Sequence, residues 1–141
     1  MANFQNNPAT YAKAIQAQLK SILEPEGVPV YINFNRNYAT EPKFLTWQIR
    51  NIHQPVYTGQ TQGNKGIDRP VFQMNLYTKR EDDAFNLLNT ILQSLHGYSG
   101  QFGGVSGFFV AKADVFVLYN SYDNEIGLQQ IVMDCTLDIP N

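Results

Sequence analysis

Few residues in this sequence are suited to catalysis, metal binding or disulfide formation. The 141 residues include one cysteine, Cys135, and two histidines, His53 and His96. A single cysteine cannot form a disulfide within the chain, which suits a reducing compartment. A domain of this length buries roughly 70% of the surface that its unfolded chain exposes, so it needs no disulfide or metal to fold. These absences exclude a disulfide-stabilised scaffold.

Long apolar runs and an export signal are missing as well. The longest apolar stretch, residues 107–118, is interrupted by Lys112 and Asp114 and is far shorter than the ~20 residues of a membrane helix. The first seven residues have neither the basic region nor the apolar region of a secretory signal. The sequence predicts a soluble protein that does not contact a membrane and is made without export.

Charge is scarce and nearly balanced. Ten basic and 12 acidic residues give a net charge of −2, and no stretch is strongly basic. Tight binding to nucleic acid through phosphate neutralisation is therefore not expected. The 14 Asn and 12 Gln outnumber the charged residues, and aromatic residues make up 13% of the chain. Interfaces between proteins are poor in charge and rich in aromatics, so this composition favours contacts with other proteins, although compositional drift would produce the same numbers.

The pattern of apolar residues predicts a single α+β domain over residues 1–141. Its core is a mostly antiparallel sheet of four to five strands with two helices packed on one face. The expected order is helix, short strand, strand, strand, helix, strand, strand. Residues 30–32 are expected to form the short strand, and alternation of apolar and polar side chains marks the strands at residues 44–53, 71–78, 109–117 and 131–139. The inward positions of the last two are Phe109, Ala111, Ala113, Val115 and Val117, then Ile131, Met133, Cys135, Leu137 and Ile139.

Both helices have sequence signals at their ends. Asn7 as N-cap and Pro8 predict the start of the first helix, residues 24–27 its end, and its apolar face is Tyr11, Ile15, Leu19 and Ile22. For the second, Thr78 and Glu81 have the spacing of a capping box, and Gly97 follows the end. Its buried side chains are expected to be Ala84, Leu88, Ile91 and Leu95, with Phe85 and Leu92 beside them.

Four segments are expected to lack regular structure. Residues 33–43 and 120–127 are polar, and residues 97–107 are rich in glycine. Residues 55–69 contain three glycines and no apolar cluster, and a structureless loop of this length is uncommon unless it has a function.

No motif points to catalysis or to a cofactor. Glu81, Asp82 and Asp83 are consecutive in a helix, where side chains diverge by about 100°, so they cannot share a metal ion. The glycine stretches lack the Lys-Ser/Thr of a phosphate loop, and Ser106 lacks the glycine spacing of a nucleophile elbow. Residues 123–125 lack the register of a calcium loop. We therefore expect no enzyme activity, no metal and no cofactor, with Cys135 as a core residue.

Several segments resemble the tail-completion (tail-terminator) proteins of long-tailed bacteriophages. They are residues 92–100 (LQSLHGYSG) with Gly104 and Val105, residues 122–134 (YDNEIGLQQIVMD), and residues 72–77 (FQMNLY) followed by Asp82, Asp83 and Ala84. The first helix and residues 30–32 also fall where that family has a helix and a short strand. The similarity covers nearly the whole chain, whereas residues 33–43 and 55–69 match nothing specific.

The resemblance implies a structural virion protein. Members form a homo-oligomeric ring, usually a hexamer, on the head-proximal end of the tail tube, where the ring stops tube growth and binds neck or head-completion proteins. DNA would pass through the ring without specific binding, in keeping with the absence of a basic patch. The protein would be assembled in the host cytoplasm and reside in the tail or neck of the virion.

Contacts with partners are expected from the two glycine-containing segments. Within residues 55–69, and in residues 97–107, the side chains best suited to such contacts are Tyr57, Gln60, Gln62, Lys65, Arg69, Tyr98 and Phe102. A solvated hairpin tip is the alternative for residues 55–69. Alternative functions are another neck component, such as a head-completion or connector protein, a small ligand-binding α+β module, and an enzyme whose site forms between subunits.

Overall fold

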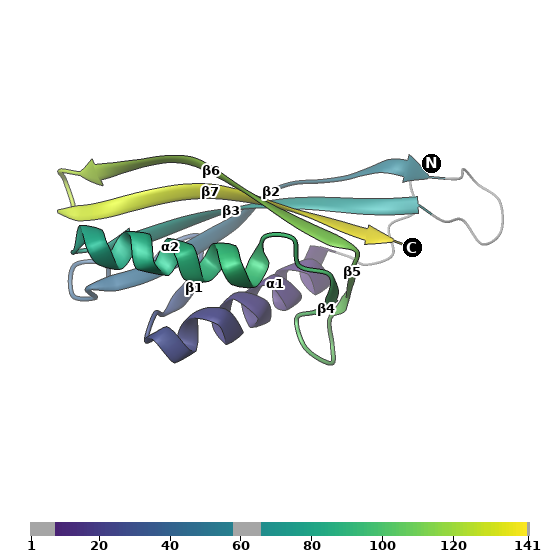
Figure 1. The fold of residues 1–141 in the computed structure, drawn as a ribbon, viewed down its shortest axis with the longest axis horizontal. Coiled ribbons are helices and arrows are strands. Elements are labelled where there is room, and N and C mark those ends of the chain that lie inside the picture. Colours follow the sequence, from purple (N-terminus) through teal and green to yellow (C-terminus); the bar gives the residue numbers. More distant parts are fainter. Residues whose placement is uncertain (1–7, 58–65, 141) are drawn as a thin grey trace.

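The computed structural model describes residues 8–57 and 66–140, which form a five-stranded sheet with both helices on one face (Figure 1). This confirms the predicted α+β class and the predicted order of the main elements. In chain order the elements are α1 (Pro8–Leu23), the 3-10 helix η1 (Glu24–Glu26), β1 (Val30–Ile32), β2 (Lys43–Tyr57), β3 (Gly66–Thr78), α2 (Glu81–Leu95), β4 (Gly100–Phe102), β5 (Phe108–Val110), β6 (Lys112–Asp123) and β7 (Leu128–Pro140).

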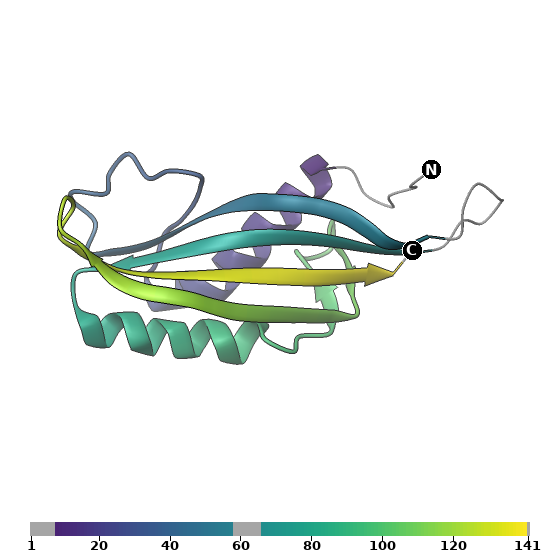
Figure 2. The same ribbon diagram turned by 90° about the horizontal axis from the view of Figure 1, so that it is seen from above.

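The strands of the main sheet are ordered β1-β2-β3-β7-β6, and Figure 2 shows them from the face opposite the helices. Neighbouring strands are antiparallel except β1 and β2, so the sheet is mixed. Residues 33–42 return the chain to the start of β2, as a parallel pair requires. Strands β4 and β5 form a separate two-stranded sheet. We call the face of the main sheet opposite the helices the outer face.

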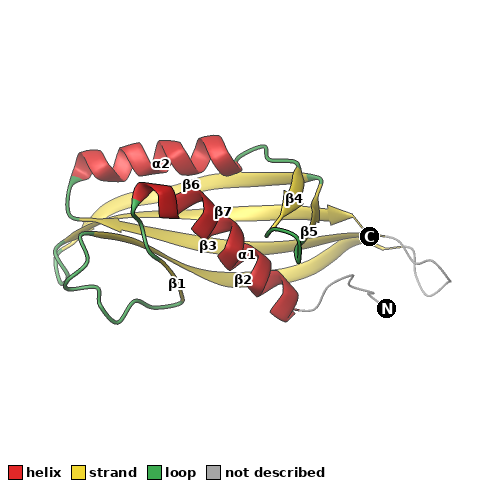
Figure 3. Ribbon diagram, turned by 90° about the horizontal axis from the view of Figure 1, so that it is seen from below, coloured by secondary structure: helices red, strands yellow, loops and turns green. Residues whose placement is uncertain are grey.

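Helix α1 crosses the sheet diagonally, as Figure 3 shows from the helix side. It begins at Pro8, as predicted, whereas Asn7 lies outside the described residues. Its buried side chains are Tyr11, Ala14, Ile15, Leu19 and Leu23, and Ile22 is partly buried. Tyr11 Oη donates a hydrogen bond to the Asp68 carboxylate (2.9 Å), which is also buried, so the start of the helix is joined to β3.

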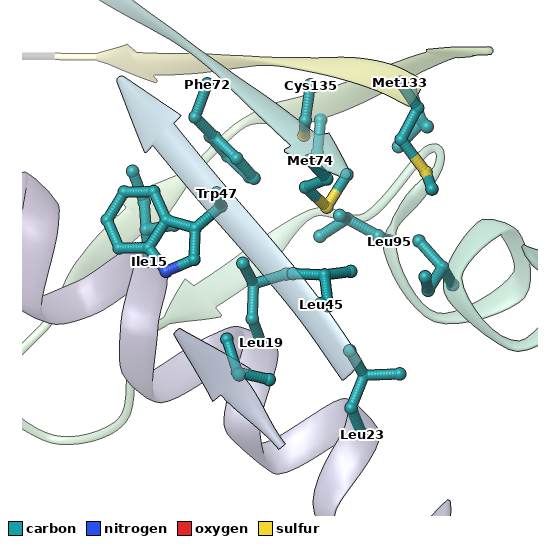
Figure 4. Packing of buried hydrophobic residues seen from close by; sticks show 14 of the residues in the cluster. Ile15, Leu19, Leu23, Leu45, Trp47, Phe72, Met74, Leu95, Met133 and Cys135 are labelled. Atoms are coloured by element: carbon teal, nitrogen blue, oxygen red, sulfur yellow. The ribbon is translucent and has the colours of Figure 1, made fainter. Parts of the chain in front are cut away.

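The core lies between the helices and the sheet (Figure 4). Trp47 on β2 is almost fully buried and packs edge-on against Phe72 of β3, with ring centroids 6.1 Å apart. Its indole N–H donates to Gln16 Oε1 of α1 (2.6 Å), so the polar atom of the largest buried side chain has a partner. Cys135 is buried in the same cluster, as expected, and burial raises the pKa of its thiol.

The second helix differs from its prediction at the start and in the buried face. Strand β3 continues to Thr78, which pairs with both β2 and β7, and the Thr78 hydroxyl donates to the Arg80 carbonyl (2.7 Å). The helix therefore begins at Glu81, and the predicted capping box is wrong. The side chain buried in the middle of α2 is Leu87, whereas Leu88 is only partly buried and Phe85 is exposed. Gly97 has a φ of 77°, as predicted for the residue after a helix.

The segment 55–69 is largely strand, which corrects the predicted loop. Val56 pairs with Ile67 and Tyr57 with Gly66, so β2 and β3 continue as one antiparallel hairpin to the edge of the described residues. Pairing with the adjacent strand, which a local pattern does not report, satisfies the backbone groups of these residues. Only residues 58–65 remain between the two strands, and they lie outside the described part of the chain.

Residues 97–123 contain several further corrections. The glycine-rich segment forms β4 and leads into β5, where Phe108 and Val110 are buried and Phe109 is exposed, opposite to the predicted alternation. Strand β6 begins only at Lys112, leaving Ala111 exposed, and continues to Asp123 through the predicted polar loop. Val117 is 44% exposed because β6 is the last strand of the sheet. In β7 the five predicted inward residues are all buried.

The buried face of α2 predicts unequal effects of two neighbouring truncations. Leu87→Ala removes a side chain that is only 5% exposed and should lower the free energy of unfolding by about 2–5 kcal/mol. Leu88→Ala, at a partly buried position, should lower it by less. Urea denaturation measures both, and an equal or reversed order would contradict the observed helix face.

A close contact between the β4–β5 hairpin and α1 predicts a second asymmetry. Gly103 and Gly104 both have positive φ, 83° and 76°, so alanine at either position should cost about 1–2 kcal/mol. A Cβ on Gly103 would also lie 2.5 Å from the Ala14 Cβ, whereas one on Gly104 would meet nothing within 4 Å. Gly103→Ala should therefore lower the melting temperature more than Gly104→Ala; similar shifts would show that the hairpin does not pack this closely on α1.

Candidate interaction surfaces

The outer face of the sheet is polar, and its charges are largely paired across strands. Arg50 on β2 contacts Asp134 on β7 (2.6 Å), and Arg69 on β3 contacts Asp138 on β7 (2.6 Å). Lys112 and Asp114 form a third pair on β6 (3.3 Å). The side chains involved are partly exposed, so each pair contributes little to stability. Because these charges are paired, the outer face has neither a strongly positive nor a strongly negative electrostatic potential.

Near the β6–β7 turn, the outer face carries aromatic side chains. Tyr77 on β3 stacks on Phe44 of β2, with ring centroids 4.9 Å apart, and accepts a hydrogen bond from the Gln130 amide (3.1 Å). A pocket of about 280 Å³ opens beside them. The loop 33–42, the turn after β6 and both strands contribute its lining: Asn33, Phe34, Asn35, Tyr38, Phe44, Thr46, Tyr77 and Ile126.

Strand β6 forms one edge of the sheet, and it exposes large apolar side chains there. They are Phe116, Val117, Leu118, Tyr119 and Tyr122, each between 44% and 59% exposed. The pairing of β6 with β7 shifts between Val117 and Tyr119, so a bulge at Leu118 reorients the strand. Sequence reasoning missed this surface because it counted Val117 as an inward residue, ended the strand there, and placed residues 120–127 in a loop. The available signal was the run 115–122, VFVLYNSY, which contains no charged residue.

A second apolar surface lies at the opposite edge of the sheet, between α1 and β1. It is a shallow groove lined by Ala12, Lys13, Gln16, Ala17, Lys20 and Ile32. Ile32 is 48% exposed, and Ala17 is also exposed. The lysines place positive charge along the groove, although Lys20 also reaches Glu24 (3.6 Å).

Of the seven predicted contact residues, the four that the structure describes do not form one site. Arg69 is engaged with Asp138, and Tyr57 lies on β2 at the last described pair of the hairpin. On the helix side of the sheet, Tyr98 is partly buried and its hydroxyl donates to the Gln101 carbonyl. Phe102 is fully buried and stacks on Phe108, so it offers no surface to a partner. Gln60, Gln62 and Lys65 lie outside the described residues.

The histidine and acidic side chains that could act in catalysis or metal binding make local structural contacts. His96 Nδ1 accepts a hydrogen bond from the Val115 backbone N–H (3.0 Å), which joins the end of α2 to β6. Asp82 pairs with Arg80 (3.0 Å), and this hydrogen-bonded contact lowers the pKa of the Asp82 carboxyl. Within residues 8–57 and 66–140, no three His, Cys, Asp or Glu side chains are placed to hold a metal ion. Neither described helix combines the length and apolar character needed to cross a bilayer.

The environment of Tyr77 predicts a dependence of stability on alkaline pH. Burial raises the pKa of Tyr77 above its usual value of 10.0, and the nearby Asp123 and Tyr119 add to the shift. The folded protein therefore keeps this proton at a pH where the unfolded chain releases it. The associated stability is present below about pH 10 and is lost as the pH rises through the raised value.

Tyr77→Phe should accordingly make the loss of unfolding free energy above about pH 10 less steep. Tyr122→Phe, at a 53% exposed position on β6, is the matched control. Urea denaturation at several alkaline pH values measures the slope for each variant. Equal slopes for the wild type and Tyr77→Phe would show that this hydroxyl is not shielded from solvent.

Solved structures with this fold include two components of phage-like particles. One is the sheath/tube terminator, in its extended state, of the extracellular contractile injection system PVC, with a TM-score of 0.58, 9% identity and coverage of 98% of this chain. The other is a chain from the virion of a native gene transfer agent particle, with a TM-score of 0.58, 10% identity and coverage of 96%.

The present chain spans 57% of the length of the PVC terminator and 100% of the gene transfer agent chain. No protein-family model and no curated protein matches the sequence. At 9–10% identity these similarities establish a shared fold, extending over nearly the entire chain.

Proposed function

We propose that this protein is a tail terminator, which ends polymerisation of a tail tube in a phage-like particle. The observation that carries the proposal is the fold shared, over 98% of the chain, with a protein described as a sheath/tube terminator. The sequence resemblance to phage tail-completion proteins, which depends on the residues alone, points the same way. The protein acts as a single structural domain over residues 1–141, not as an enzyme, and uses no cofactor.

The exposed surfaces support a role in assembly. Beyond Val115, strand β6 presents an edge with large apolar side chains that no described strand covers, whereas edge strands in soluble proteins are usually short, charged or covered. Apolar side chains gathered in this way mark sites of contact with other proteins. In the proposed function, identical copies form a ring, a hexamer as in the family that the sequence resembles. The ring caps the head-proximal end of the tube and binds a neck or head-completion protein on its other side.

The electrostatics support passage of DNA through such a ring. A lumen lined with free Lys and Arg would retain DNA through counterion release. On the outer face, Arg50 and Arg69 are both neutralised by aspartates of β7. This face can therefore line a channel for DNA without binding it. The protein would be assembled in the host cytoplasm and remain in the tail or neck of the particle.

Two other functions have some support. The shared fold suits another neck component, such as a head-completion or connector protein, because fold alone does not specify the position in the particle. The aromatic pocket beside Tyr77 favours a small ligand-binding module. A ligand that raises the melting temperature of the wild type but not of a Tyr77→Ala variant would favour the module over the terminator.

The β2–β3 hairpin provides the test of tail termination. We propose that residues 58–65, with Tyr57 at their base, form a contact arm toward the tube or neck. Because Tyr57 and Gly66 are paired, an Asn-Gly turn can replace residues 58–65 and close the hairpin directly. This variant should still melt cooperatively, but tails assembled with it should vary in length, as electron microscopy of the particles would measure.

A second variant separates side-chain contacts from hairpin length. Replacing residues 58–65 by eight Gly and Ser residues preserves the length of the connection and removes its side chains. If the side chains make the contact, this variant should fail like the shortened one. Tails of normal length from both variants would show that the hairpin tip is a solvated loop and not an arm.

A further inference from the structure

The free edge of β6 has the features of a surface that is covered in an assembly. Its seven residues Phe116–Tyr122 contain no charged residue and no proline, two of the features that protect edge strands. Five of them expose large apolar or aromatic side chains, and the bulge at Leu118 leaves Val117, Leu118 and Tyr119 all exposed in succession. Among the described residues no strand pairs with the free side of β6.

The α1–β1 groove lies at the edge of the sheet opposite β6, and Figure 3 shows the positions of the three elements. The groove is complementary to the β6 edge. Both surfaces include apolar side chains. The groove also carries the basic residues Lys13 and Lys20, and the acidic residues Asp123 and Glu125 lie at the end of β6, so the two surfaces have opposite charges. Backbone pairing of β6 from another copy directly with β1 is disfavoured. This strand has only three residues, and two of its carbonyls already accept hydrogen bonds, Val30 from Gln16 (3.0 Å) and Ile32 from the Phe34 backbone (2.7 Å).

We infer that the β6 edge of one copy docks into the α1–β1 groove of a second copy, head to tail. This inference rests on the proposed function, because a ring between a tube and a neck needs all its copies to point the same way. A two-fold pairing of β6 with β6 would reverse alternate copies and close after two. Two different surfaces at opposite edges of one sheet, in contrast, generate a ring when the rotation between copies closes.

Two variants with the same sign of charge test the docking. The strand variant Leu118→Lys/Tyr119→Lys blocks the β6 edge, and the groove variant Ala17→Lys/Ile32→Lys blocks the groove; all four positions are exposed, so folding should be retained. Phe109→Lys, at a 53% exposed position on β5 outside both surfaces, is the control. Native mass spectrometry and sedimentation velocity measure the assembly of each purified chain and of an equimolar mixture.

The wild type and Phe109→Lys should form closed oligomers, and each blocked variant should self-associate about tenfold or more weakly. The equimolar mixture should yield a one-to-one heterodimer, because a single native interface remains: the groove of the strand variant with the β6 edge of the groove variant. The opposite interface places lysines against lysines and stays open.

Three results would overturn the inference. One is a wild type that stays monomeric at all accessible concentrations, and another is a mixture that forms no heterodimer. The third is a groove variant that assembles like the wild type while the strand variant does not, which would indicate two-fold pairing through β6. If the mixture forms the heterodimer and both hairpin variants give tails of normal length, the docking surfaces are supported and the contact arm is contradicted. If particles lacking the protein also had tails of normal length, the terminator function itself would fail.

Discussion

Packing of α1 and α2 on a single face of the sheet is the interaction on which the rest of the structure depends. Trp47 is central to it, because its ring fills the space under α1 and its N–H is satisfied by Gln16 of the same helix. Two helices of 16 and 15 residues bury one face of five strands, and they leave uncovered the outer face and the β6 edge beyond Val115. The surfaces available for assembly follow from this limited coverage.

The two uncovered surfaces have different physical characters. The outer face is polar, with arginines neutralised across strands, so it can remain in water or face a charged polymer without attracting it. The β6 edge is apolar and uncharged, so its exposure to water is unfavourable and a protein contact there would lower the free energy. The proposed ring would use both characters, one surface along the channel and one between neighbours. This division supports a structural role more directly than any single residue does.

Periodicity within one element determined much of the fold. The spacing of Tyr11, Ile15 and Leu19 located α1 and its buried face, and the alternation from Ile131 to Ile139 located β7. Cys135 was placed in the core by the same alternation. These predictions hold because a helix or strand with one buried face shows that face in its own sequence. From the scarcity of charge and the absence of catalytic motifs, the sequence also predicted protein contacts and no catalysis, which stays a prediction.

Features that depend on a distant partner were decided only by the tertiary structure. Thr78 has the sequence of an N-cap, but pairing with β2 and β7 keeps it in a strand. Leu87 and Leu88 are equivalent in type, and the position of the sheet beneath α2 decides which is buried. The residues around 55–57 and 66–69 became a hairpin because each strand satisfies the other, and residues 116–122 became an exposed edge because no described strand pairs with that side of β6. Strand pairing joins residues far apart in sequence, so a local pattern reports which residues can be buried but not which edge is left open.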